Sequence, residues 1–374
     1  MREQLAQYRD EMVDLTKRLI AIATENPPGE RYRECADLLY AELRRLGFAD
    51  TRMEGDCVLS FVGNGDRTLY FHGHYDVVPA QSRSQFDPCV KGANLFGRGS
   101  SDMKSGLAAM IYAAKAIRDS GPALDGRIGL VLVPDEETAG PRGSQYLAER
   151  GILGAGGVGM LLPEPTGGVV WNGNRGAITL RATVRGKTAH VGRQHEGANA
   201  FEKAIPVLQR VLNLKREVEA RGSILMMGGR SEGGTNFNAV PDWFSFTLDR
   251  RINPGEEIGA EKRRLLEALE GGDAKIEVEV LQQGSSSSVS GDGPLGRTLA
   301  QSIQQVTGKA AQFEMCPGLL EIRFYAERGV PAFAYGPGLL TVSHGPNEFV
   351  PVDRIVACAT VYALTAIEML RKRA

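Results

Sequence analysis

The 374-residue sequence has few cysteines, few histidines and almost no net charge. Its five cysteines are widely spread and form no C-x-x-C pair, which excludes an obvious disulfide scaffold or zinc knuckle and favours reduced thiols. The 44 basic and 45 acidic residues leave a formal net charge of −1, so nothing supports nucleic-acid binding or polybasic attachment to a membrane. Histidine chemistry has only five candidates: His72, His74, His190, His195 and His344.

Long hydrophobic runs are also missing. The longest, residues 355–367, contains two threonines and is too short to cross a bilayer, so it is typical of a buried terminal helix. The polar, amphipathic start of the chain predicts that no signal peptide is present. We therefore expect a cytoplasmic protein.

The order of the expected elements indicates an α/β fold with a second domain inserted into it. Residues 5–19 have helical periodicity, and continuous apolar runs such as residues 128–133 are typical of strands covered on both faces. Residues 176–285 favour a small α+β unit with an antiparallel sheet, and residues 282–288 are expected to form a flexible exit from it. We predict a helix-covered, mostly parallel sheet in residues 1–175 and 286–374, with the inserted domain between them.

One glycine-rich segment resembles a cofactor motif but has the wrong neighbours. Residues 154–159 match G-x-G-x-x-G. A dinucleotide site needs a strand before this motif and a helix after it, whereas a helix-like stretch precedes it here and a strand-like one follows. A glycine-rich turn is the better interpretation.

Histidines and carboxylates recur at the ends of successive expected strands, where α/β sheets place their ligands. The set is His72, His74, Asp76, Asp102, Asp135, Glu136, Glu137, Glu164 and His344. Each has an ordinary alternative, such as a helix cap for Asp102 or a buried structural role for His74. Together, however, so many carboxylates at adjacent strand ends would repel one another, and bound cations would remove that repulsion.

The candidate ligands suit a pair of divalent metals. Two histidines and three carboxylates can hold two ions roughly 3.5–4 Å apart that share one carboxylate. Because the ligands are nitrogen and oxygen without thiolate, we expect Zn²⁺, with Co²⁺ or Mn²⁺ as alternatives.

Several motifs occur in an order that resembles one group of hydrolases. They are N-P-P-G-E (26–30), H-Y-D-V-V-P (74–79), G-R-G-S-S-D-M-K-S-G (97–106), the acidic pair 136–137, E-P-T (164–166) and Y-G-P-G (335–338). They span almost the whole chain. Through these motifs the chain resembles the two-metal amidohydrolases and peptidases that include acetylornithine deacetylase, succinyl-diaminopimelate desuccinylase, aminoacylase and glutamate carboxypeptidase.

This resemblance implies a ligand set for two metals. His74, Asp102 and Glu164 would hold one ion. Asp102, Glu137 and His344 would hold the other, so that Asp102 bridges the pair.

The resemblance also implies two catalytic residues beside the ligands. Asp76 would orient the imidazole of His74 and raise its basicity. Glu136 would take a proton from the attacking water and return it to the departing amine. The implied reaction is hydrolysis of an N-acyl amino acid to a carboxylate and a free amine.

The inserted domain resembles the family's lid and dimerisation domain, which implies a homodimer. His190, in G-K-T-A-H (186–190), matches a histidine that stabilises the oxyanion, often from the partner subunit. Asn238, Arg251 and Arg323 match positions that hold the substrate's carboxylate, a group that arginine binds in a bidentate manner. His195 is interpreted as an exposed loop residue.

The sequence departs from the family pattern just before Arg323. Leu320 and Glu321 stand where the family has a hydroxyl residue and an aspartate. We therefore expect an altered substrate pocket. His72 precedes the H-x-D unit of residues 74–76, and we interpret it as structural.

Two other functions fit the same motifs. A dipeptidase or carboxypeptidase would use the same metals, because the motifs do not specify the pocket for the acyl group. An inactive homologue that binds metal or amino acids would have lost a base or a ligand, whereas here every ligand position is present together with Glu136 and Asp76.

Overall fold

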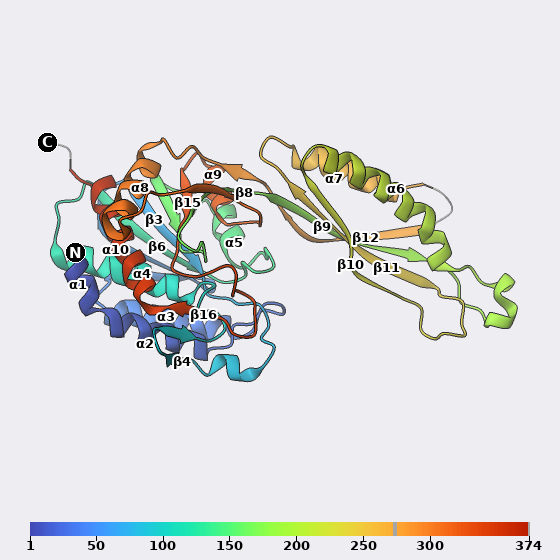
Figure 1. Ribbon diagram of the computed structural model, residues 1–374, viewed down its shortest axis with the longest axis horizontal. Helices are drawn as coiled ribbons and strands as arrows, with labels where there is room; N and C mark the ends of the chain where they lie inside the picture. Colours follow the sequence, from blue (N-terminus) through green and yellow to red (C-terminus); the bar gives the residue numbers. More distant parts are fainter. Residues whose placement is uncertain (272–274, 373–374) are drawn as a thin grey trace. The chain divides into compact units, whose positions relative to one another are not determined.

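The structure is a computed structural model that describes residues 1–271 and 275–372. Its contacts divide the chain into two compact units (Figure 1). The first unit comprises Met1–Gly173, Ser288–Met315 and Glu321–Ala374, and the second comprises Asn174–Ser287 and Cys316–Leu320. The sequence prediction places the inserted domain at residues 176–285 and does not include Cys316–Leu320 in it.

A large mixed sheet forms the centre of the first unit. Its strands, in spatial order, are β1 (Asp50–Glu54), β2 (Cys57–Asn64), β6 (Gly126–Val133), β3 (Thr68–His74), β7 (Gly157–Leu162), β15 (Ala332–Ala334), β8 (Val170–Asn174) and β13 (Ser287–Ser288), with β14 (Phe313–Cys316) paired to β8. The central strands β6, β3, β7 and β15 are parallel, whereas β1, β2 and β8 pair in antiparallel fashion. The carboxyl ends of the parallel strands therefore meet at one edge of the sheet.

Helices cover this sheet, as the continuous apolar runs predicted (Figure 1). Every residue of β3 is buried. The helices are α1 (Arg2–Gln7), α2 (Arg9–Ala21), α3 (Tyr32–Arg45), α4 (Lys104–Ser120), α5 (Ser144–Glu149), α8 (Pro294–Thr307), α9 (Ile322–Ala326) and α10 (Val352–Met369). Helix α4 packs against α2, α10 and β3, while α9 contacts α5, β7 and β15. A small sheet of β4 (Cys89–Lys91), β5 (Asn94–Phe96) and β16 (Phe349–Pro351) completes this unit.

Local sequence sets the ends of several helices. The single helix expected over residues 5–19 is broken at Tyr8 into α1 and α2. Helix α4 ends at Gly121, whose φ of 60° favours glycine. The longest apolar run forms the buried helix α10. In the described part of the chain, no helix is long and apolar enough to span a membrane.

The second unit is an antiparallel sheet covered by two long helices. Its strand order is β10 (Ile224–Gly233), β11 (Trp243–Ile252), β9 (Gly176–Arg185) and β12 (Lys275–Gly284), and its helices are α6 (Ala200–Ala220) and α7 (Ile258–Leu269). The alternation in β9 buries Ile178, Leu180, Ala182 and Val184 in the core that α6 and α7 share.

Two details of this unit differ from the sequence prediction. Strand β10 was missed, because it is an exposed edge strand interrupted at Gly228–Gly229, where its register with β11 shifts. The flexible exit was placed too early, since residues 282–284 belong to β12.

Candidate metal centre

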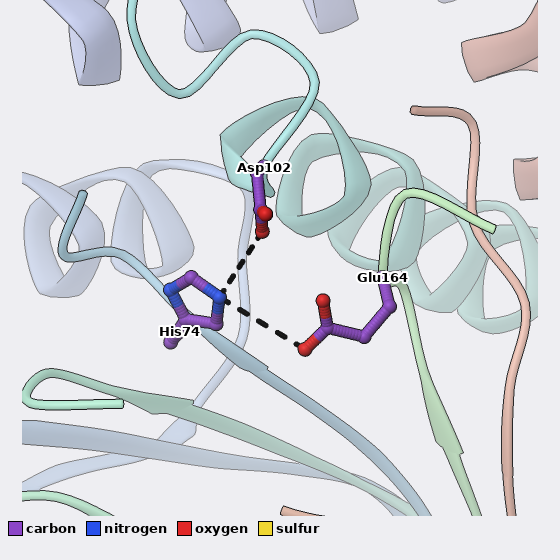
Figure 2. A group of neighbouring side chains, drawn as sticks. All are labelled: His74, Asp102 and Glu164. Carbon is purple, nitrogen blue, oxygen red and sulfur yellow. Dashed lines mark ion pairs between the residues drawn. The ribbon is translucent and has the colours of Figure 1, made fainter. Parts of the chain in front are cut away.

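A first group of candidate metal ligands gathers where β3 and β7 end (Figure 2). His74 is the last residue of β3, Asp102 lies before α4, and Glu164 follows β7. The Nε2 atom of His74 lies 3.4 Å from Oδ1 of Asp102 and 3.9 Å from Oε1 of Glu164. All three residues are buried, and one potential ligand atom from each lies within 4.8 Å of the others.

A second group shares Asp102 with the first. The Nε2 atom of His344 lies 3.3 Å from Oδ2 of Asp102 and 3.4 Å from Oε2 of Glu137. These ligand atoms also lie within 4.8 Å of one another. Asp102 thus directs one oxygen towards each histidine, which is the arrangement of a bridging carboxylate. It does not cap α4, whose N-cap residue is Met103.

The carboxylates of this centre fit divalent cations. Asp102 Oδ1, Glu137 Oε1 and Glu164 Oε1 are buried without a hydrogen-bond partner, a costly state for a carboxylate oxygen unless a cation contacts it. Burial, followed by the negative charge of Asp102, raises the pKa of Glu164 well above its ordinary value. Burial likewise raises the pKa of Glu137. A bound cation would favour the ionised form of both groups.

The two histidines respond to the same carboxylates. Hydrogen bonds with Asp102 and Glu137 raise the pKa of His344 to about 10. Burial alone would lower the pKa of His74, but its contacts with Asp102 and Asp76 outweigh burial and raise that pKa well above its ordinary value. A divalent cation would take the place of the extra protons, because imidazole binds metals in its neutral form.

Asp76 connects the first histidine to the acidic pair. Its Oδ1 lies 3.4 Å from Nδ1 of His74. The same carboxylate accepts hydrogen bonds from the backbone amides of Glu136 (3.2 Å) and Glu137 (3.1 Å). Asn26 Nδ2 donates to its Oδ2 at 2.8 Å. Asp76 is therefore placed to fix both an imidazole ring and the segment that carries two glutamates.

Glu136 lies beside the first group. Its Oε2 is 3.9 Å from Nε2 of His74, and its side chain is 13% exposed. Burial, with smaller effects from Glu321 and Glu137, raises the pKa of Glu136 well above its ordinary value, although His74 opposes this. A carboxylate whose proton affinity is raised in this way can take up and release a proton during a reaction.

His72 lies among buried side chains that can hydrogen-bond with it. It is fully buried, its Nε2 lies 2.8 Å from Oε2 of Glu321 and 2.9 Å from Oγ of Ser144, and its Nδ1 lies 3.1 Å from the hydroxyl of Tyr325. Glu321, which departs from the family pattern, is thus held by His72. Arg323, on α9, is 5% exposed, and although burial lowers its pKa, the charges of Glu321 and Glu136 favour its protonated form.

The second unit carries the other predicted site residues. His190 and Asn238 are exposed and lie on adjoining segments, with Val191 N donating to Asn238 O at 3.0 Å. Arg251 lies at the opposite end of the sheet, paired in register with Ala177, and its Nε lies 2.7 Å from Oδ1 of Asp249. The unit therefore brings His190 and Asn238 together but not Arg251. His195 is exposed in the 3₁₀ helix η2 (Val191–Glu196).

Sequence reasoning missed three buried polar residues around the centre: Asn26, Arg98 and Glu348. Asn26 and Arg98 lie inside the N-P-P-G-E and G-R-G-S-S-D motifs, so membership of a motif was a usable signal for them. Glu348 follows His344 by four residues, and no periodicity marks it.

Comparisons with known proteins agree on fold and family. Residues 70–368 match the model of peptidase family M20/M25/M40. A succinyl-diaminopimelate desuccinylase from Buchnera aphidicola subsp. Acyrthosiphon pisum (strain Tuc7) is 28% identical, and the match covers 94% of this chain and 96% of that protein.

Solved structures show the same architecture. The di-peptidase Dug1p from Saccharomyces cerevisiae superposes with a TM-score of 0.82 at 14% identity, covering 100% of this chain and 98% of its own. YXEP from Bacillus subtilis, described as a dinuclear metal binding peptidase from the M20 family, gives a TM-score of 0.67 at 14% identity, covering 98% and 99%. These likenesses confirm the predicted α/β fold with an additional antiparallel domain.

Proposed function

The chain belongs to peptidase family M20/M25/M40 and is a metal-dependent hydrolase of amide bonds, and we propose that its substrate is an N-acyl amino acid. The observation that carries the proposal is the carboxylate of Asp102, which faces a histidine on each side, with Glu136 beside one of them. Similarity to a desuccinylase over 94% of the chain supports an acyl group on the substrate nitrogen. A dipeptidase or carboxypeptidase that uses the same side chains is the alternative.

Two divalent ions per chain complete the proposed site. His74, Asp102 and Glu164 would hold one, and Asp102, Glu137 and His344 would hold the other. Imidazole and carboxylate ligands without thiolate favour Zn²⁺, with Co²⁺ or Mn²⁺ as alternatives. When bound, the ions activate water and stabilise negative charge on the carbonyl oxygen.

Glu136 moves the proton in this mechanism. It accepts a proton from the water that attacks the amide carbonyl, and it donates that proton to the amine nitrogen as the C–N bond breaks. Asp76 acts as a positioning residue, because it contacts the ring of His74 and the backbone amides of Glu136 and Glu137.

The second unit acts as a lid in this proposal. His190 donates a hydrogen bond to the developing oxyanion, while Asn238, Arg251 and Arg323 bind the substrate's carboxylate. Because Asn238 and Arg251 lie at opposite ends of the sheet, different chains would contribute them to one site. Arg251 already pairs with Asp249, so the substrate would share or replace that partner.

We further propose a homodimer that forms through the second unit. Apolar side chains are exposed on α6 (Phe201 and Ile205) and on the edge strand β10 (Ile224 and Met226), each by 42–52%. Exposed apolar side chains beside an unpaired strand edge favour association with a second copy.

A cytoplasmic location is also part of the proposal. Cys35, Cys57, Cys89 and Cys358 are free thiols, as expected in a reducing compartment.

A substrate panel tests the proposed function. After loading with Zn²⁺ or Co²⁺, the enzyme is expected to hydrolyse at least one N-acyl amino acid with a kcat/KM roughly tenfold or more above that for any dipeptide. Release of free amine is measured by chromatography, with Glu136→Gln as the blank. A preference for dipeptides would establish the peptidase alternative, and two bound metals without turnover on any substrate would indicate a binding protein.

Removal of His344 tests the ligand assignment. Because His344 contributes to one ion only, His344→Ala is expected to lose about one metal equivalent per chain. Elemental analysis after dialysis measures the loss, and His195→Ala, which removes an exposed histidine of the second unit, should keep both ions. Two tightly bound ions in His344→Ala would show that the ligand set is wrong.

A further inference from the structure

The second group depends on three segments without regular structure, those that carry Asp102, Glu137 and His344. Asp102 lies in the turn that precedes α4, and His344 lies in the segment between β15 and β16. The His344 side chain is 50% exposed. Its backbone has a φ of 65°, in the left-handed region that residues other than glycine adopt uncommonly. Such a conformation persists only where the surroundings hold it.

Glu348 holds the segment that carries Asp102. Its Oε1 accepts hydrogen bonds from three backbone amides, those of Gly99 (3.0 Å), Ser101 (2.9 Å) and Asp102 (3.0 Å). Glu348 is 2% exposed, and its backbone oxygen accepts a further hydrogen bond from Gly97 N at 3.1 Å. The turn before α4 is therefore wrapped around one carboxylate supplied by the His344 segment.

Arg98 connects this carboxylate to His344. Its Nη1 donates to Oε2 of Glu348 at 2.5 Å, and both side chains are 1% exposed. Its Nη2 donates to the carbonyl oxygen of His344 at 3.1 Å and to Oε1 of Gln81 at 2.8 Å. Gln81 Nε2 donates to the same His344 carbonyl at 2.9 Å. Arg98 and Gln81 thus both donate hydrogen bonds to the backbone carbonyl of His344, the residue with the left-handed φ.

We propose that Glu348 and Arg98 are positioning residues that set the distance between Asp102 and His344 and so determine the affinity of the second metal. The inference rests on the proposed metal pair and deepens it. Neither side chain is a ligand in that proposal, but together they join two of the three segments on which the second ion depends, those of Asp102 and His344. Residues that orient metal ligands typically affect metal affinity by roughly 10–100-fold.

A buried ion pair could instead stabilise the fold in general, and a matched control separates the two roles. Glu42 is also 2% exposed and also pairs with arginines, at 2.9 Å from Arg18 and 2.6 Å from Arg45, but it lies on α3 and contacts none of the ligands. Glu348→Gln and Glu42→Gln each remove one buried carboxylate charge. Only the first change affects the contact between the two ligand segments.

The experiment titrates the metal-stripped full-length protein with Co²⁺ and follows visible absorption and binding heat. We expect Glu348→Gln to weaken binding of the second equivalent by roughly 10–100-fold and to change its absorption spectrum, while Glu42→Gln binds both equivalents as the unaltered protein does. Unchanged affinity in Glu348→Gln, or equal weakening in Glu42→Gln, would overturn the proposal.

A milder variant covers the case in which Glu348→Gln does not fold. Gln81 is exposed, so Gln81→Leu removes one donor to the His344 carbonyl without breaking a buried pair. It should weaken the second equivalent several-fold, and unchanged binding would count against the proposal. The titration contains no substrate, so a negative substrate panel alongside the expected Co²⁺ result would reject the proposed reaction but not the positioning role.

Discussion

Glu136→Gln is expected to lower turnover by roughly 10²–10⁴-fold while the protein keeps both metal ions. The amide has the size of the carboxylate but cannot accept a proton from water at neutral pH. Glu136 belongs to neither group of candidate metal ligands, so the substitution leaves His74, Asp102 and Glu164 unchanged. The loss should therefore fall on kcat rather than on metal content.

Steady-state kinetics and elemental analysis on one preparation measure both quantities. Glu137→Gln is the matched comparison, because the neighbouring glutamate is a proposed ligand and its loss should reduce metal content as well.

The acidic limb of the pH profile should also belong to Glu136, since activity falls as its carboxylate becomes protonated. Residual activity in Glu136→Gln should therefore lack this limb. Near-normal turnover in the variant would remove Glu136 from the mechanism.

Removal of the metals is expected to abolish turnover and to lower the unfolding temperature of the first unit. The carboxylates of Asp102, Glu137 and Glu164, each with a buried oxygen that has no hydrogen-bond partner, would then lie close together without the ions. An ion present at about 1,000 times its dissociation constant adds about 4 kcal/mol to the free energy of unfolding, and this stabilisation disappears with the ion.

Calorimetry before and after chelation measures the second effect. Reloading with Zn²⁺ or Co²⁺ should restore both activity and the higher unfolding temperature, whereas Mg²⁺, which prefers oxygen ligands and keeps several waters, serves as the control ion. A protein shown to be free of metal that retains its activity and its unfolding temperature would contradict the metal-centre interpretation.

Much of the first unit could be predicted because its signals are local. The apolar run 128–133 predicts a strand covered on both faces, and that is its place in β6. Strands of this kind pair in parallel and end at one edge, so the proximity of His74 and Glu164 follows from their positions at the ends of β3 and β7. The family resemblance supplied the division of these residues between two ions.

Other features depend on contacts that no local pattern records. The hydrogen bond from Asp102 N to Glu348 joins residues 246 positions apart in the sequence. The edge position of β10 follows from how the strands of the second unit pair. Polar residues such as Asp102 and Glu348 have several compatible environments, and only the folded chain selects one.

The length of the sheet in the second unit limits which residues of one chain can contact the same substrate molecule. Arg251 and Trp243 lie eight positions apart in β11, which corresponds to about 26 Å at 3.3 Å per residue, and His190 and Asn238 lie beyond the Trp243 end. An N-acyl amino acid is shorter than this span. If both ends contact the same substrate, they must come from different chains, and a defective copy would then impair the active site of its intact partner.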